Sequence, residues 1–298
     1  MTVRWNRREL LLAAAAFIPT SLAMAKDPKS KDSSGAAAEA IAAIEKTLGG
    51  RLGVAAWQTG TEKRIEHRSG ERFPMCSTFK FLAVAAVLSR IDRKEDKLDR
   101  IVRYTKNDLI VHAPIAKQHV QEGMTVSALC TAALKYSDNT AANLLLASLG
   151  GPDHITRYAR LLGDPVTRLD RNEPTLNTAI KGDVRDTTTP AAMLDDMRKL
   201  LIEEGALSAG SQNQLREWLI GNTTGGTMLR AGLPSGWRVG DKTGHGDNGS
   251  TNDIAICWPS NRQPILITAY FVESHAPDKD CDAAIAKVGE VVANEFTG

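Results

Sequence analysis

An apolar segment, Phe81–Leu88, is the feature that most constrains the fold of this chain. It consists of Phe, Leu, Ala and Val, and Gly and Pro are absent until well past Arg90, which predicts a buried helix rather than a strand. Ser77 and Lys80 precede it, three residues apart. Residues at that spacing share a helix face, so the Lys80 amine can reach the Ser77 hydroxyl. A serine needs such a base to become a nucleophile, and free N–H groups at a helix start can stabilise an oxyanion.

Size and composition indicate a globular protein. The chain has 298 residues, a net charge of +2 and 42% hydrophobic residues, which suffices for a large core. The balanced charge gives no reason to expect nucleic acid as a partner. The sequence contains no stretch of about 18 apolar residues, the length that is needed to span a bilayer, so we expect no membrane anchor.

Residues 1–25 have the pattern of a signal peptide. Arg4–Glu9 is a charged start, Leu10–Pro19 is an apolar run, and the segment closes with an Ala-x-Ala site at Ala25. The Arg7-Arg8 pair favours the twin-arginine route over the general secretory route. We therefore expect an exported protein of the bacterial periplasm.

The order of strand-like and helix-like segments predicts an α/β fold of the α+β type. Strand-like runs occupy residues 51–57, 63–67, 237–243, 253–258 and 264–272, and the middle of the chain is helical. We expect a five-stranded antiparallel sheet flanked by helices, with an all-helical domain inserted between its second and third strands. The predicted boundaries are a signal peptide (1–25), an α/β domain in two parts (26–75 and 222–298) and the helical domain (76–221).

Two segments outside the regular pattern also carry predictions. Lys26–Gly35 is polar and is expected to be a flexible leader before a first helix at Ala36–Leu48. Asp164–Thr188 is charged, has no apolar period and is interrupted by proline and glycine. A loop of that length inside a compact domain is usually functional.

A Ser-x-x-Lys spacing is weak support for catalysis by itself, because a chain of this size contains it about once by chance. Three further clusters strengthen it: Ser137-Asp138-Asn139 between two predicted helices, Glu173 with Asn177 in the long loop, and Lys242-Thr243-Gly244 at a strand end. Each has an ordinary structural explanation, namely a helix cap, a solvated acid and an edge-strand lysine. Their joint occurrence in this order favours a catalytic site over coincidence.

Together these motifs resemble the signatures of class A serine β-lactamases. The likeness runs from about Ala37 to the C-terminus and includes Arg171 and Asp186, which it implies form an ion pair at the base of the long loop. The resemblance implies hydrolysis of the amide bond of β-lactam antibiotics through an acyl-serine intermediate, giving antibiotic resistance. It implies no metal and no cofactor. The expected partners are β-lactam substrates and β-lactamase inhibitors, bound by a monomer.

The resemblance also implies which residues act in acylation and what each of them does. Ser77 Oγ would attack the lactam carbonyl, and either Lys80, or Glu173 through a water molecule, would take its proton. The backbone N–H groups of Ser77 and His245 would hold the oxyanion. Ser137 would pass a proton to the leaving nitrogen.

The remaining roles implied by the resemblance concern substrate binding and deacylation. Asn139 would bind the side-chain amide of the substrate, and the Lys242-Thr243-Gly244 strand would bind the rest of it, with Lys242 beside Ser137. Asn177 and Glu173 would hold and activate the water that frees the acyl-serine.

Several positions depart from the family pattern. Many relatives carry an arginine that binds the substrate carboxylate, but here Thr251, Met228 and Asp282 stand at the corresponding positions. Recognition is therefore expected to rest on Lys242, Thr243 and Thr251. His112 stands in a loop position where relatives usually have an aromatic residue, and His112 and His245 are expected to flank the cleft. These departures leave carbapenems open as substrates beside penicillins and cephalosporins.

The four cysteines, Cys76, Cys130, Cys257 and Cys281, match no zinc-site spacing. Export permits disulfides, but an even number of cysteines does not require them. Some relatives bridge a cysteine like Cys76 to one just beyond Lys-Thr-Gly, where this chain has His245-Gly246. Cys76 is therefore expected to be a free thiol.

Two other functions share part of the motif set. A cell-wall transpeptidase or D-Ala-D-Ala carboxypeptidase has the first three motifs but stays acylated by penicillin, and a non-enzymatic β-lactam sensor only binds covalently. Both normally lack the glutamate that activates water for deacylation. The presence of Glu173 with Asn177 favours the hydrolase.

Overall fold

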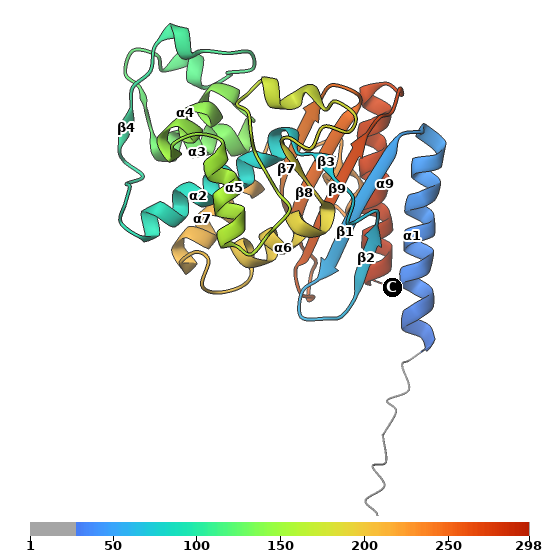
Figure 1. Cartoon of the computed structure of the whole chain (residues 1–298). Helices are drawn as coiled ribbons and strands as arrows, with labels where there is room; N and C mark the ends of the chain where they lie inside the picture. Colours follow the sequence, from blue (N-terminus) through green and yellow to red (C-terminus); the bar gives the residue numbers. More distant parts are fainter. Residues whose placement is uncertain (1–27, 298) are drawn as a thin grey trace, which may run out of the picture.

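The computed structural model describes residues 28–297, so the predicted signal peptide lies outside the described residues. Its centre is a five-stranded antiparallel sheet with the strand order β2-β1-β9-β8-β7 (Figure 1). The strands are β1 (Arg51–Gln58), β2 (Arg64–His67), β7 (Arg238–Gly246), β8 (Ser250–Trp258) and β9 (Ile265–Val272). Every residue of β9 is buried, as the continuous apolar sequence of a central strand requires. The predicted α+β fold with this sheet is confirmed.

Helices cover both faces of the sheet (Figure 1). One face packs against α1 (Pro28–Leu48), α8 (Leu229–Gly232) and α9 (Asp278–Thr297). The other packs against the middle of the chain, whose helices are α2 (Phe79–Asp92), α3 (Val126–Lys135), α4 (Asn139–Leu149), α5 (Asp153–Leu161), α6 (Pro190–Leu201) and α7 (Ala209–Ile220). The hydrophobic core on this second face extends from the sheet into these helices, and α6 packs directly on β1 and β9.

The middle of the chain is not purely helical. Two short antiparallel ladders lie within or beside it: β3 (Phe73–Pro74) pairs with β6 (Thr187–Thr188), and β4 (Ile101–Val102) pairs with β5 (Met124–Thr125). Each strand has only two residues, too few to produce a recognisable alternation in the sequence. The boundaries between the α/β domain (26–75 and 222–298) and the helical domain (76–221) stay a prediction.

Two predicted boundaries differ from the structure. The first helix begins at Pro28, not at Ala36, so most of the segment predicted as a leader is helical. A proline is well tolerated in the first turn of a helix, which makes this start compatible with the polar sequence that follows. Ser77 lies in a 3₁₀ turn, Cys76–Thr78, that leads into α2 rather than in α2 itself.

In residues 28–297 no helix is long and apolar enough to cross a membrane. The same part of the chain holds no group of three or more His, Cys, Asp or Glu residues that could bind a metal ion.

A buried acid on α6 makes stability depend on pH. Neither carboxyl oxygen of Asp196 has a hydrogen-bond donor among the described residues. Burial, followed by the charge of nearby Asp164, raises the pKa of Asp196 well above its usual value. The folded chain therefore holds this proton more tightly than the unfolded chain. Stability should fall as pH rises from the pKa of an unfolded aspartate towards this raised value.

We expect Asp196→Asn to remove that loss, because an amide stays neutral and can donate to the Asp164 carboxylate. The free energy of unfolding near neutral pH should rise by about 1–3 kcal/mol, the cost of an unsatisfied buried polar group. Urea unfolding across the pH range measures this, with Asp195→Asn as the control because Asp195 is the exposed neighbour. Equal pH dependence of stability in wild type and Asp196→Asn would contradict the account.

Candidate active site

The nucleophile candidate, Ser77, is held between two possible bases. Its hydroxyl donates to Glu173 Oε1 at 3.0 Å, and Lys80 Nζ lies 2.9 Å from Ser77 Oγ. Ser77 is only 8% exposed, so the hydroxyl is largely shielded from water but can still be reached. The turn before α2 positions it, with Lys80 on the first turn of the helix directly beneath.

Lys80 is fully buried among polar partners. Its amine also contacts the Ser137 carbonyl oxygen at 2.8 Å, Asn139 Oδ1 at 2.6 Å and Glu173 Oε1 at 3.0 Å. Burial lowers the pKa of Lys80, although the charge of Glu173 partly opposes this shift. A lowered pKa favours the neutral amine, which is the form that can accept a proton.

A second buried lysine lies on the other side of Ser137. Lys242 Nζ donates to Ser137 Oγ at 3.0 Å, and Lys80 Nζ lies 3.3 Å from the same oxygen. Burial, followed by repulsion from Lys80, lowers the pKa of Lys242 to about 7. The Ser137 hydroxyl can therefore exchange protons with either amine.

Glu173 and Asn177 face each other across one turn of the long loop. Asn177 Nδ2 donates to Glu173 Oε2 at 2.5 Å. Asn143 fixes the backbone of Glu173 from α4, since its side chain accepts from Glu173 N at 3.0 Å and donates to Glu173 O at 2.9 Å. The carboxylate is consequently held by both its side chain and its backbone.

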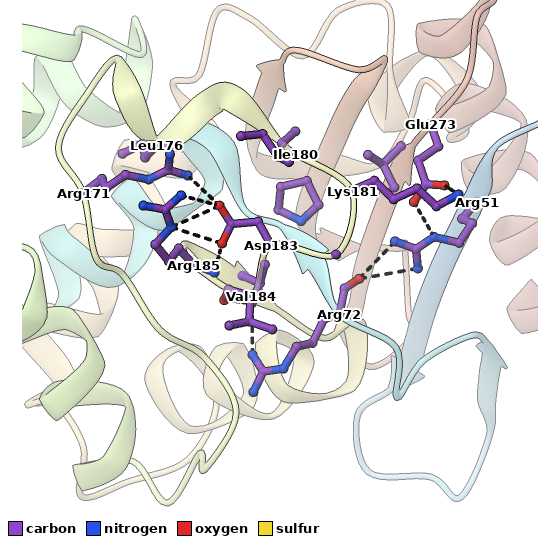
Figure 2. A pocket seen from close by; sticks show the side chains of 15 residues that line it. Arg51, Arg72, Arg171, Leu176, Ile180, Lys181, Asp183, Val184, Arg185 and Glu273 are labelled. Carbon is purple, nitrogen blue, oxygen red and sulfur yellow. Dashed lines mark hydrogen bonds and ion pairs between the residues drawn. The ribbon is translucent and has the colours of Figure 1, made fainter.

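The long loop closes on itself through Arg171 and Asp186. Arg171 Nε lies 2.6 Å from Asp186 Oδ2, and Asp186 Oδ1 accepts from the backbone N–H of Asp170 and Arg171. Behind the loop lies a cavity of about 110 Å³, and Figure 2 shows Arg171 and Arg185 converging on Asp183 along its wall. This network fixes the loop whose other side carries Glu173.

Strand β7 forms the wall of the site opposite the long loop, and it runs very close to Ser77. A Cβ added at Gly244 would lie 3.0 Å from Ser77 N, and one at Gly246 would lie 2.6 Å from Asn177 O. A side chain at Gly246 would force the backbone to shift, and one at Gly244 would be tightly confined. Because β7 is an edge strand, its outer edge has no neighbouring strand.

A cleft of about 290 Å³ lies above Ser77. Its lining comprises Ser77, His112, Ser137, Asn139, Asn177, Thr224, Thr243, Gly244 and His245. The structure thus brings most of the predicted site residues together around one opening. Thr251 is buried on β8 opposite His245 and is not among the lining residues, and its contact with substrate stays a prediction.

Both histidines at the cleft have partners. His245 Nε2 lies 3.0 Å from Asp282 Oδ1, and His112 Nε2 lies 3.1 Å from the carbonyl oxygen of Tyr136. The side chains of both are exposed to solvent. Their rings are therefore oriented by the protein but remain accessible.

Three residues at the site have backbone conformations that L-amino acids rarely adopt. Cys76, His112 and Ser137 have φ angles of +45°, +58° and +54°. Such strained positions concentrate at functional sites, where the surrounding structure maintains them. All four cysteines, Cys76 among them, are free thiols in the structure.

Sequence reasoning gave no role to Asn143 and Thr224, and gave Asp138 only that of a helix cap. Asn143 supports Glu173, and its position four residues after Asn139 on the same helix could have pointed to it. Asp138 caps α4 and accepts from the backbone of Ile115 and Ala116, which ties the His112 loop to the site. Thr224, whose hydroxyl lies 2.5 Å from that of Thr243, comes from a distant turn and had no sequence signal.

Comparison with known proteins agrees with this geometry. The model of the "Beta-lactamase enzyme family" matches residues 36–296. The solved structure of an ancestral (GNCA) class A β-lactamase superposes with a TM-score of 0.86 at 55% identity, covering 87% of this chain and all of that one. The chain belongs to the class A β-lactamase family.

Natural class A β-lactamases are similar over most of their length. β-Lactamase OXY-1 of Klebsiella oxytoca is 46% identical over 285 residues, covering 96% of this chain and 97% of that protein. β-Lactamase Toho-1 of Escherichia coli is 49% identical over 256 residues, covering 86% and 88%. The putative class A β-lactamase PenP of Rhodopseudomonas palustris has a solved structure with 52% identity and a TM-score of 0.86, covering 87% and 99%. The predicted family is confirmed.

Proposed function

We propose that this class A β-lactamase hydrolyses the β-lactam amide through an acyl-serine at Ser77, and thereby confers antibiotic resistance. The observation that carries the proposal is the double contact of Ser77 Oγ, at 2.9 Å from Lys80 Nζ and 3.0 Å from Glu173 Oε1. A hydroxyl shared by two proton acceptors can be activated from either side.

Acylation begins when Ser77 Oγ attacks the lactam carbonyl carbon. Lys80 or Glu173 accepts the hydroxyl proton, and the backbone N–H groups of Ser77 and His245 stabilise the oxyanion. The lactam C–N bond then breaks, and Ser137 protonates the nitrogen. Ser137 recovers a proton from Lys80 or Lys242, both within 3.3 Å of its hydroxyl.

Deacylation requires an activated water molecule on the other face of the ester. Asn177 helps to orient the water, and Glu173 accepts its proton as the water oxygen attacks the ester carbon. The bond from that carbon to Ser77 Oγ then breaks, and Glu173 returns the proton to Ser77 Oγ. Asn177 Oδ1 supports the role of orienting the water, because it is buried and receives no hydrogen bond from the described part of the chain. Buried acceptors of this kind are normally satisfied by water or ligand. This element favours the hydrolase over a transpeptidase or a sensor.

Substrate binding is assigned to the walls of the cleft. Asn139 binds the side-chain amide of the substrate, while Lys242, Thr243 and the backbone of Gly244 and His245 receive the ring carboxylate and carbonyl. We propose penicillins and cephalosporins as substrates and a monomer as the active form. This range can be tested by measuring how the purified protein hydrolyses a panel of penicillins, early cephalosporins, oxyimino-cephalosporins and carbapenems. The proposal would be refuted if no penicillin in the panel were hydrolysed.

We also propose export to the periplasm with cleavage after Ala25. The charged, apolar and Ala-x-Ala pattern of residues 1–25 supports this proposal. The intact mass of the periplasmic protein would reveal the cleavage position, and retention of residues 1–25 would contradict it.

The two histidines should make substrate affinity depend on pH. Imidazole is the side chain whose charge usually changes near neutral pH, and a positive ring at position 245 would face the Asp282 carboxylate. We expect KM for carboxylate substrates to fall about twofold between about pH 7.5 and about pH 5.5, since a partly exposed charge contributes on the order of 0.5 kcal/mol. Salt should reduce the change.

The matched protein for this measurement is the His112→Gln, His245→Gln double variant. Titration of Lys242, whose pKa is about 7, changes KM in both proteins. The difference between their pH profiles therefore isolates the histidines. Identical profiles would show that the histidines do not supply a counter-charge.

A further inference from the structure

An acid lies behind His245, which is one of the residues that line the cleft. Asp282, near the start of α9, places Oδ1 3.0 Å from His245 Nε2, and Thr227 Oγ1 donates to its Oδ2 at 2.7 Å. These two contacts fix the position of the carboxylate. The Asp282 side chain is 18% exposed, so the group is held by the protein and still in contact with solvent.

No lysine or arginine in residues 28–297 forms an ion pair with Asp282. Two nearby cations have other partners: Lys242 is buried and donates to Ser137 Oγ and the Thr243 carbonyl oxygen, and Arg230 pairs with Asp241. Among the described residues, His245 is the only basic side chain within ion-pair distance of Asp282. This end of the cleft therefore combines the proposed carboxylate-binding wall with a neighbouring acid.

We propose that Asp282 selects β-lactams that carry a positive charge next to the ring carboxylate. This inference rests on the proposed function, in which Lys242 and Thr243 receive the carboxylate. In a cephalosporin the substituent on the adjacent ring carbon enters the same end of the cleft. A pyridinium or quaternary ammonium group there is attracted by Asp282, whereas a neutral substituent gains no such attraction.

The solvent exposure of the Asp282 side chain sets the size of the expected preference for cationic substrates. Partly exposed charges interact weakly because water and salt screen them, and such a pair changes binding by about two- to fivefold. The effect should appear in KM more than in kcat, because Asp282 contacts no reacting atom.

The test compares two cephalosporins with the same acyl side chain, one with a pyridiniummethyl and one with an acetoxymethyl substituent. The kcat/KM ratio of the cationic to the neutral substrate is measured for wild type and Asp282→Asn. Intrinsic reactivities differ between the substrates but cancel when the two ratios are compared. Asn keeps one acceptor oxygen, and its amide N–H can donate to the hydroxyl oxygen of Thr227, so the fold should persist.

Asp280→Asn is the matched control, since Asp280 lies on the same helix but lines a groove against α1. We expect the ratio to fall about two- to fivefold in Asp282→Asn, to stay unchanged in Asp280→Asn, and to decrease in wild type at high salt. If both substrates are hydrolysed and Asp282→Asn keeps the wild-type ratio, the inference is wrong. If neither is hydrolysed by wild type, the proposed function itself fails.

Discussion

Glu173→Gln should acylate and then stall. The glutamine side chain keeps the shape of glutamate and can still accept from Asn177, but it cannot take a proton from water. We expect deacylation to slow by about 100- to 10,000-fold, the usual contribution of a general base. Intact-mass measurement after mixing with a penicillin should show one stable adduct per chain.

The same variant separates the two candidate acylation bases. The charge of Glu173 raises the pKa of Lys80, so its removal lowers that pKa further and leaves more neutral amine. Adduct formation at the wild-type rate would identify Lys80 as a sufficient base, and slow formation would identify Glu173. Glu217→Gln, an exposed glutamate on α7, is the control. Unimpaired steady-state turnover by Glu173→Gln would contradict the assigned role.

Ser77→Ala should abolish covalent labelling. The substitution deletes one oxygen, which removes the attacking atom and its contacts with Lys80 and Glu173. We expect kcat/KM to fall by more than about 10,000-fold, as for other enzymes that lose their nucleophile. The thermal unfolding transition should remain cooperative. Ser69→Ala, outside the cleft, is the control, and an adduct on Ser77→Ala would show that another residue is the nucleophile.

Most of the fold could be predicted because local signals agreed with the tertiary structure. The ends of α3 and α4 follow from local signals, since Thr125 and Asp138 cap the two helices with side-chain oxygens and Gly150 ends α4 in a left-handed conformation. Each such cap depends on one residue at the end of the helix and needs no long-range contact. The two-residue strands β3 to β6 exist only because distant segments pair, so no local pattern predicted them.

The site could be predicted as far as its motifs extend, and no further. Ser77, Ser137, Glu173 and Lys242 belong to short patterns whose residue types match their chemistry. Thr224 and the pairing of Asp282 with His245 depend on elements that meet only in the folded chain.

The most direct test of hydrolysis by an acyl-serine is a count of turnovers. The purified protein is mixed with a large molar excess of a chromogenic cephalosporin, and product is measured per enzyme molecule over time. The arrangement of Ser77, Lys80, Glu173 and Asn177 predicts continuous production of many product molecules per chain. A single burst of one product per chain would indicate a transpeptidase or a sensor that stays acylated, and no product at all would contradict the assignment of the site.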